Sequence, residues 1–159
     1  YDCQFAKAKE ILEKYSEENT NNVWGNFALG TTYHSLGDYP AAVLQYKKVN
    51  AREEGEAAEA ASFNLGVIHA LYFRKSRDPR DLKKVQSYLE KSLQLAGELS
   101  IARGRERMNK IQEALKPISQ RPSMHCVENY APDDLSSLAK EKGFLGWLQE
   151  KKATFTKAF

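Results

Sequence analysis

A pattern that recurs about every 34 residues constrains this chain more than any other feature. Between residues 23 and 56 it runs Leu-Gly, a tyrosine, Gly-Asp-Tyr, a small residue and an aromatic one. Its members are Leu29, Gly30, Tyr33, Gly37, Asp38, Tyr39, Ala42, Tyr46 and Val49. Gly37-Asp38 in its middle predicts a turn between two helices. Gly37 would end the first helix in the left-handed conformation, and Asp38 would cap the second.

Part of the pattern also stands 34 residues earlier. The positions that match Tyr39, Ala42, Tyr46 and Val49 are Phe5, Ala8, Leu12 and Tyr15. All four are apolar or small, so residues 3–17 are predicted to be the second helix of a preceding repeat.

A third copy follows with an interruption. Leu65-Gly66 lies 36 residues after Leu29-Gly30, and its second half comes seven residues late. The insertion falls within 72–80, where we expect it to extend the first helix by a turn or two and to lengthen the turn. Asp78 is the expected N-cap of the following helix, with Pro79 in its first turn.

This pattern resembles the tetratricopeptide repeat (TPR) family over roughly residues 3–96. The resemblance implies an all-α chain folded as a right-handed α-solenoid of antiparallel helix pairs, cut from a larger TPR protein. It also implies close approach of paired helices at Gly30 and Gly66. The expected units of the segment 1–116 are a half repeat at 3–17, a repeat at 23–56, a repeat with the insertion at 59–97 and a capping helix at 99–116.

The rest of the chain departs from the repeat. Proline, serine and asparagine in 117–132 predict a linker. Two amphipathic C-terminal helices are expected in 133–159, the first with Leu135, Leu138 and Ala139 on one face and a break at Gly143. The second carries an apolar cluster of Phe144, Leu145, Trp147 and Leu148. Such a cluster would cap the last repeat, fill the chain's own groove or dock on another chain.

Composition excludes several classes of protein. Hydrophobic residues make up 42% and charged residues 28%, and no apolar run approaches the roughly 20 residues that cross a bilayer. We therefore expect no membrane association. Two distant cysteines, Cys3 and Cys126, favour reduced thiols and a cytoplasmic or nuclear location.

No enzyme signature stands in the chain, and no metal or cofactor site is expected. The only histidines are His34, His69 and His125, too few for most metal sites. His69 occupies an inward repeat position, which predicts a buried histidine with a satisfied hydrogen bond.

The resemblance implies a binding groove lined by the first helix of each pair. Trp24, Phe27 and Phe63 would contact apolar side chains of a bound peptide, and Asn26 and Asn64 would hydrogen-bond its backbone. The remaining expected groove residues are Thr31, His34, Val67, Ala70, Leu71, Arg103 and Arg107. A clamp for a C-terminal carboxylate, known in this family, is disfavoured because residues 23–36 contain no lysine.

A basic cluster extends from Arg74 to Lys110. Eleven Lys and Arg oppose five Asp and Glu there, a net +6 that exceeds the +3 of the whole chain. An acidic partner or RNA would fit it, but Tyr88 is its only aromatic residue, and nucleic acid is therefore disfavoured. The hypotheses are a peptide-binding adaptor, a subunit that uses its C-terminal helices as an interface, and RNA binding. The oligomeric state stays open.

Overall fold

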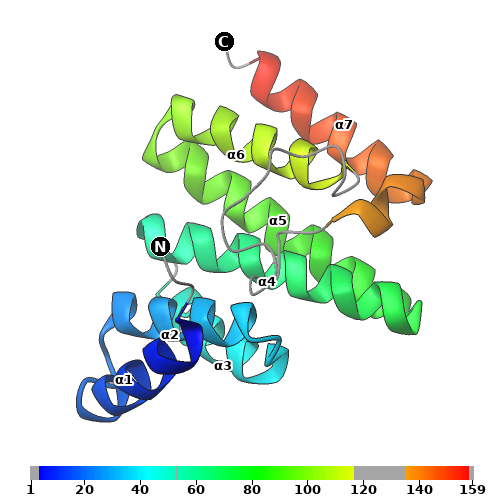
Figure 1. Ribbon diagram of the computed structural model, residues 1–159. Helices are drawn as coiled ribbons and strands as arrows, with labels where there is room; N and C mark the ends of the chain where they lie inside the picture. Colours follow the sequence, from blue (N-terminus) through cyan, green and yellow to red (C-terminus); the bar gives the residue numbers. More distant parts are fainter. Residues whose placement is uncertain (1–3, 53, 117–134, 158–159) are drawn as a thin grey trace. The chain divides into compact units, whose positions relative to one another are not determined.

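The computed structural model describes residues 4–52, 54–116 and 135–157, and within them every regular element is a helix (Figure 1). The elements are α1 (Phe5–Glu18), α2 (Val23–Ser35), α3 (Tyr39–Asn50), α4 (Gly55–Ser76), α5 (Pro79–Leu99), α6 (Ile101–Ala114), the 3₁₀-helix η2 (Ser136–Lys140) and α7 (Lys142–Lys157). The all-α prediction is thereby confirmed for these residues. The expected linker at 117–132, Cys3, Cys126 and His125 lie outside them.

The chain divides into two compact units. Of the described residues, 4–52 and 54–61 form unit 1, and 62–116 and 135–157 form unit 2. The division falls inside α4, whose first turns belong to unit 1.

In unit 1, α2 packs against both α1 and α3. Close to the α2–α3 turn, the rings of His34 and Tyr39 lie 5.8 Å apart. Farther from the turn, Phe27 lies 5.9 Å from Tyr46. These two contacts mean that α3 returns along α2.

Two glycines make this return possible, as the sequence predicts. Gly37 has φ 78° in the turn, a left-handed conformation that costs glycine nothing. At Gly30, a Cβ would lie 2.8 Å from Cε1 of the buried Tyr46, so only glycine admits this ring. Asp38 then caps α3 by accepting a hydrogen bond from the Ala41 amide at 3.2 Å.

Unit 2 is built around one apolar core. At Gly66 on α4, a Cβ would lie 2.8 Å from Cδ2 of Leu89 on α5. Residues from α4, α5, α6, η2 and α7 share the core: Phe63, Val67, Ala70, Phe73, Val85, Leu89, Leu93, Met108, Ile111, Ala114, Leu135, Leu138, Phe144 and Leu148. This core brings the last helix of the chain against α6.

The inserted residues lengthen helices and leave the turn short. α4 and α5 have 22 and 21 residues, against 13 and 12 in α2 and α3. Only Arg77 and Asp78 separate them, so the expected longer turn is wrong. Arg77 reverses the chain alone with φ 57°. Asp78 caps α5 as predicted, accepting from the Arg80 amide at 2.9 Å, with Pro79 in the first turn.

The C-terminal elements also differ from the prediction in one place. Gly143 does not break the helix; it lies in the first turn of α7, where the backbone N–H has no intrahelical partner to lose. The break falls at Glu141, whose backbone is extended. Leu135 and Leu138 are fully buried, whereas Ala139 is exposed, because a 3₁₀-helix repeats every three residues.

Candidate functional site

One side of α2 in unit 1 exposes a large aromatic residue. Trp24 is 57% exposed, and its ring meets the ring of the half-buried Phe27 edge-on at 5.9 Å. Thr31 follows one helical turn later. We call Trp24, Phe27 and Thr31 the α2 aromatic face. No Asp, Glu, Lys or Arg occurs among the 13 residues of α2, which is unusual for a helix that meets water.

Contacts at the start of α2 hold this face in position. Asn22 caps the helix by accepting from the Gly25 amide at 2.7 Å. Its side-chain amide donates to the Tyr15 hydroxyl at 3.1 Å, and the Tyr15 ring lies where a side chain on Gly25 would be. Because Trp24 lies between Asn22 and Gly25, its backbone is fixed on both sides.

Behind Phe27, the aromatic face continues into the interior of unit 1 through Tyr46. The Tyr46 hydroxyl donates to Oγ1 of Thr31 at 3.3 Å and lies 3.5 Å from Nδ1 of His34. His34 is only 4% exposed. Tyr46 therefore joins Thr31 of the α2 aromatic face to the buried His34, the second of these expected groove residues.

Asn26 is turned toward α1 rather than to solvent. Its side-chain amide donates to the Thr20 carbonyl at 3.1 Å, and its oxygen accepts from Oγ of Ser16 at 3.3 Å. The side chain is 4% exposed. A bound peptide would have to displace these bonds to reach it, so in the structure Asn26 joins α1 to α2.

A second hydrogen-bonded contact between α1 and α2 raises the pKa of a tyrosine. The Tyr33 hydroxyl donates to Oε1 of Glu13 at 2.5 Å. Burial of the phenol, followed by this bond to a carboxylate, raises the pKa of Tyr33 to about 12. Tyr33 therefore stays a neutral donor across the physiological range.

Phe63, one of the groove residues expected in unit 2, is covered by two cationic side chains. Phe63 is 1% exposed, and the Arg107 guanidinium and Lys110 ammonium stand 4.3 and 5.1 Å from its ring centre. A cation placed over the face of an aromatic ring is attracted to that ring. Asn64, Arg103 and Arg107 are partly exposed, while Val67, Ala70 and Leu71 are buried. Phe63 is thus a core residue of unit 2.

His69 is buried and hydrogen-bonded, as its position in the repeat predicts. It is 5% exposed, and its Nδ1 lies 3.1 Å from Oδ1 of Asp81. The other Asp81 oxygen accepts a bond from Ser76 at 3.4 Å. The His69 ring stacks on Tyr88 at 5.6 Å. These contacts tie α4 to the first turns of α5.

The C-terminal cluster is divided between core and surface. Phe144 and Leu148 are 0% and 6% exposed within the core of unit 2, and Leu145 and Trp147 pack against that core while partly exposed. Lys151 also pairs with Glu90 across α7 and α5. Phe144 and Leu148 thus pack into the core of unit 2 itself.

The sequence patterns alone do not mark three residues that hold central positions in these contacts. Tyr46 stands behind the α2 aromatic face, Lys110 covers Phe63, and Asp81 accepts from two groups. Lys110 follows Arg107 by three residues, the spacing of neighbours on a helix surface, and that signal could have found it.

No family model matches the chain, and no curated protein or solved structure matches it either. None of the helices in the described part of the chain combines the length and apolar character that crossing a bilayer requires. In the same residues, no group of three His, Cys, Asp or Glu side chains could hold a metal ion.

Proposed function

We propose that this chain is a TPR-type helical-repeat module that binds a peptide or helix of a partner protein. The proposal includes a solenoid of antiparallel helix pairs and a cytoplasmic or nuclear location. One observation carries it: Trp24 presents an exposed indole on a helix without any charged residue.

Several features make this face suited to binding. Tryptophan is among the residues that dominate binding energy at protein interfaces, since it buries a large area at a small entropic cost. Phe27 and Tyr46 support the indole from behind, and Tyr15 and Asn22 fix its backbone. A preformed aromatic site loses little conformational freedom on binding.

The test begins with peptides selected from a displayed random library on the intact chain. Their affinities are then measured by fluorescence anisotropy for the unaltered chain, Trp24→Ala and Leu44→Ala. Leu44 on α3 is a matched control because it is also 57% exposed in unit 1. Removal of a hot-spot tryptophan costs about 2 kcal/mol or more of binding free energy. We therefore expect Trp24→Ala to weaken peptide binding about 30-fold or more.

We expect the Leu44→Ala chain to bind as the unaltered chain does. Circular dichroism verifies that both variants stay folded. If Trp24→Ala leaves the affinities unchanged, or both variants lose them equally, the α2 aromatic face is not the binding site.

A further inference from the structure

The end of α4 and the start of α5 carry a dense group of cationic side chains. We call them the hairpin-tip cations: Arg74, Lys75, Arg77, Arg80, Lys83 and Lys84. Between residues 74 and 84 only Asp78 and Asp81 oppose these six, so this short stretch has a net charge of +4. The whole chain has +3.

The acidic groups near the tip are engaged within unit 2. Asp81 faces inward, with 17% of its side chain exposed, and bonds to His69 and Ser76. Glu141 pairs with Arg77 at 2.6 Å, and Asp78 pairs with Arg80 at 2.7 Å. The Arg80 hydrogen bonds hold the pKa of Asp78 below its ordinary value.

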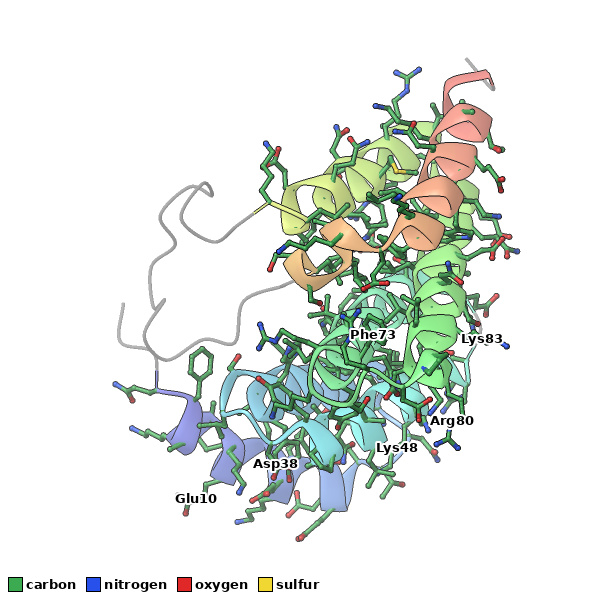
Figure 2. The ribbon with its side chains drawn as sticks, turned by 90° about the vertical axis from the view of Figure 1, so that its right-hand side faces the viewer. Glu10, Asp38, Lys48, Phe73, Arg80 and Lys83 are labelled. Carbon is green, nitrogen blue, oxygen red and sulfur yellow. The ribbon has the colours of Figure 1, made fainter. Side chains whose placement is uncertain are left out.

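Three lysines at the tip remain exposed: Lys75, Lys83 and Lys84. Lys83 and Lys84 follow Arg80 by three and four residues, so the three side chains share one side of α5. Figure 2 shows Arg80 and Lys83 projecting outward from α5. Lys75 lies in the last turn of α4, across the two-residue turn.

Helix electrostatics explain only part of this arrangement. Arg74 and Lys75 stand at the C-terminal end of α4, where the helix dipole favours cations. Of the three cations on α5, only Arg80 stands in the first turn, where the same dipole disfavours it, whereas Lys83 and Lys84 lie beyond the reach of the dipole. The helix dipole therefore does not account for Arg80, Lys83 and Lys84, and their exposed, clustered charge points to an external anionic partner.

The surroundings of the tip discriminate among anionic partners. Phe73 is 4% exposed and covered by the Arg77 guanidinium at 4.5 Å, and Tyr72 lies against His69. The described rings near the tip, Tyr88 included, thus pack against other side chains, which disfavours stacking on bases. The exposed apolar residues of unit 2, Leu99 and Ile101, lie at the far end of α5 and the start of α6, so the tip has no exposed large apolar residue to insert into a bilayer.

We propose that the hairpin-tip cations bind an acidic segment, rich in Asp and Glu, of a partner protein. Guanidinium and ammonium groups match carboxylates in charge and hydrogen bonding. The α2–α3 hairpin has no such surface, because its turn consists of Leu36, Gly37 and Asp38. This second binding surface is separate from the α2 aromatic face and does not depend on it.

A labelled peptide of alternating Glu and Ser, titrated with the intact chain, tests the proposal. The variant Lys75→Gln/Lys83→Gln/Lys84→Gln removes three exposed charges at the tip. The matched control Lys7→Gln/Lys47→Gln/Lys48→Gln removes three exposed charges from unit 1. We expect the tip variant to bind about tenfold more weakly, from three exposed pairs at typical strengths. The control should bind as the unaltered chain does, and added salt should weaken binding.

Each other outcome overturns the proposal. Equal loss in both variants would mean that net charge alone attracts the peptide. Tighter binding of an oligouridylate or of phosphatidylserine vesicles than of the peptide, sensitive to the same tip lysines, would assign the surface to nucleic acid or membrane. Absence of peptide binding at low salt would exclude an acidic segment. Trp24→Ala should leave this affinity unchanged, which keeps the result separate from that for the α2 aromatic face.

Discussion

The α2–α3 and α4–α5 hairpins share a close helix contact at a glycine and differ in helix length and surface charge. Gly30 receives the Tyr46 ring, and Gly66 receives Leu89, each so close that a Cβ would require the neighbouring side chain to shift. Yet α4 and α5 are longer than α2 and α3 by nine residues each. One close approach of two helices therefore specifies a hairpin, and helix length and surface charge are free to vary around it.

The two turns solve the same problem with different residues. Each reverses the chain through one left-handed residue, Gly37 in one hairpin and Arg77 in the other. Glycine adopts this conformation without strain, whereas arginine is strained there. Arg77 gains contacts that Gly37 lacks, a cation–π contact with Phe73 and an ion pair with Glu141.

The largest expected effect comes from comparing Phe144, a buried aromatic residue of unit 2, with Trp24, an exposed one of unit 1. Phe144→Ala removes a fully buried ring from a packed core and should lower the free energy of unfolding by about 3–5 kcal/mol. Trp24→Ala should change it by less than about 1 kcal/mol, since the side chain is 57% exposed.

Urea unfolding followed by circular dichroism measures both variants. A Phe144→Ala cost as small as that of Trp24→Ala would mean that α7 does not close the core of unit 2 in solution.

The next effect compares the two glycine contacts. In Gly30→Ala the new methyl meets the Tyr46 ring, which Phe27 and His34 confine, so overpacking should cost about 1–3 kcal/mol. In Gly66→Ala the methyl meets the branched end of Leu89, which can rotate. The gain in helix propensity of about 1 kcal/mol offsets much of that cost.

Urea midpoints of the two variants decide the comparison. Equal midpoints would show that the Tyr46 ring moves as freely as Leu89.

The sequence predicts the features that a single residue determines locally. Gly37 and Asp78 act as predicted because a left-handed turn and an N-cap depend on the residue type at one position. The burial of Phe144 follows from its apolar spacing. Trp24 is the expected groove residue that the structure leaves most exposed.

Features that depend on a neighbouring helix could not be predicted in this way. Phe63 is buried because Arg107 and Lys110 of α6 cover it, and the register of α6 against α4 is a tertiary property. Asn26 is occupied because Ser16 and Thr20 reach it from the preceding segment. The turn at Arg77 is short because nonlocal contacts support a conformation that arginine disfavours by itself.

A smaller effect is expected from replacing the left-handed residue in each of the two turns. Gly37→Ala should lower the free energy of unfolding by about 1 kcal/mol, since no atom lies near the new methyl and only its backbone conformation is strained. Arg77→Gly should change stability by less than about 1 kcal/mol, because relief of strain offsets the lost cation–π contact and ion pair.

Thermal unfolding compares the two turn variants. A large loss for Arg77→Gly would mean that its side-chain contacts, rather than its backbone, determine the turn.

The smallest effect concerns the cap of α5. Arg80 follows Asp78 by two residues, whereas Pro40 follows Asp38. The Arg80 hydrogen bonds lower the folded-state pKa of Asp78 from the ordinary 3.8. Its contribution to stability is therefore fully present above that unfolded-state value and is lost as the pH falls through the lower folded-state pKa.

Carboxyl NMR titration of the unaltered chain and Arg80→Gln measures this shift. We expect the Asp78 pKa to move up toward 3.8 in the variant. An unchanged pKa would assign the shift to another cause.

The first helix has a property that sets it apart from the other elements of unit 1. No residue of α1 is buried, and it is joined to α2 by side-chain bonds at Glu13, Tyr15 and Ser16. An element held by so little apolar contact opens without global unfolding, so its amides should exchange with deuterium first and its backbone should be the first target of proteases. Each such opening uncovers Gly25 of α2 for a moment, and α1 is therefore the most readily detached helix of unit 1.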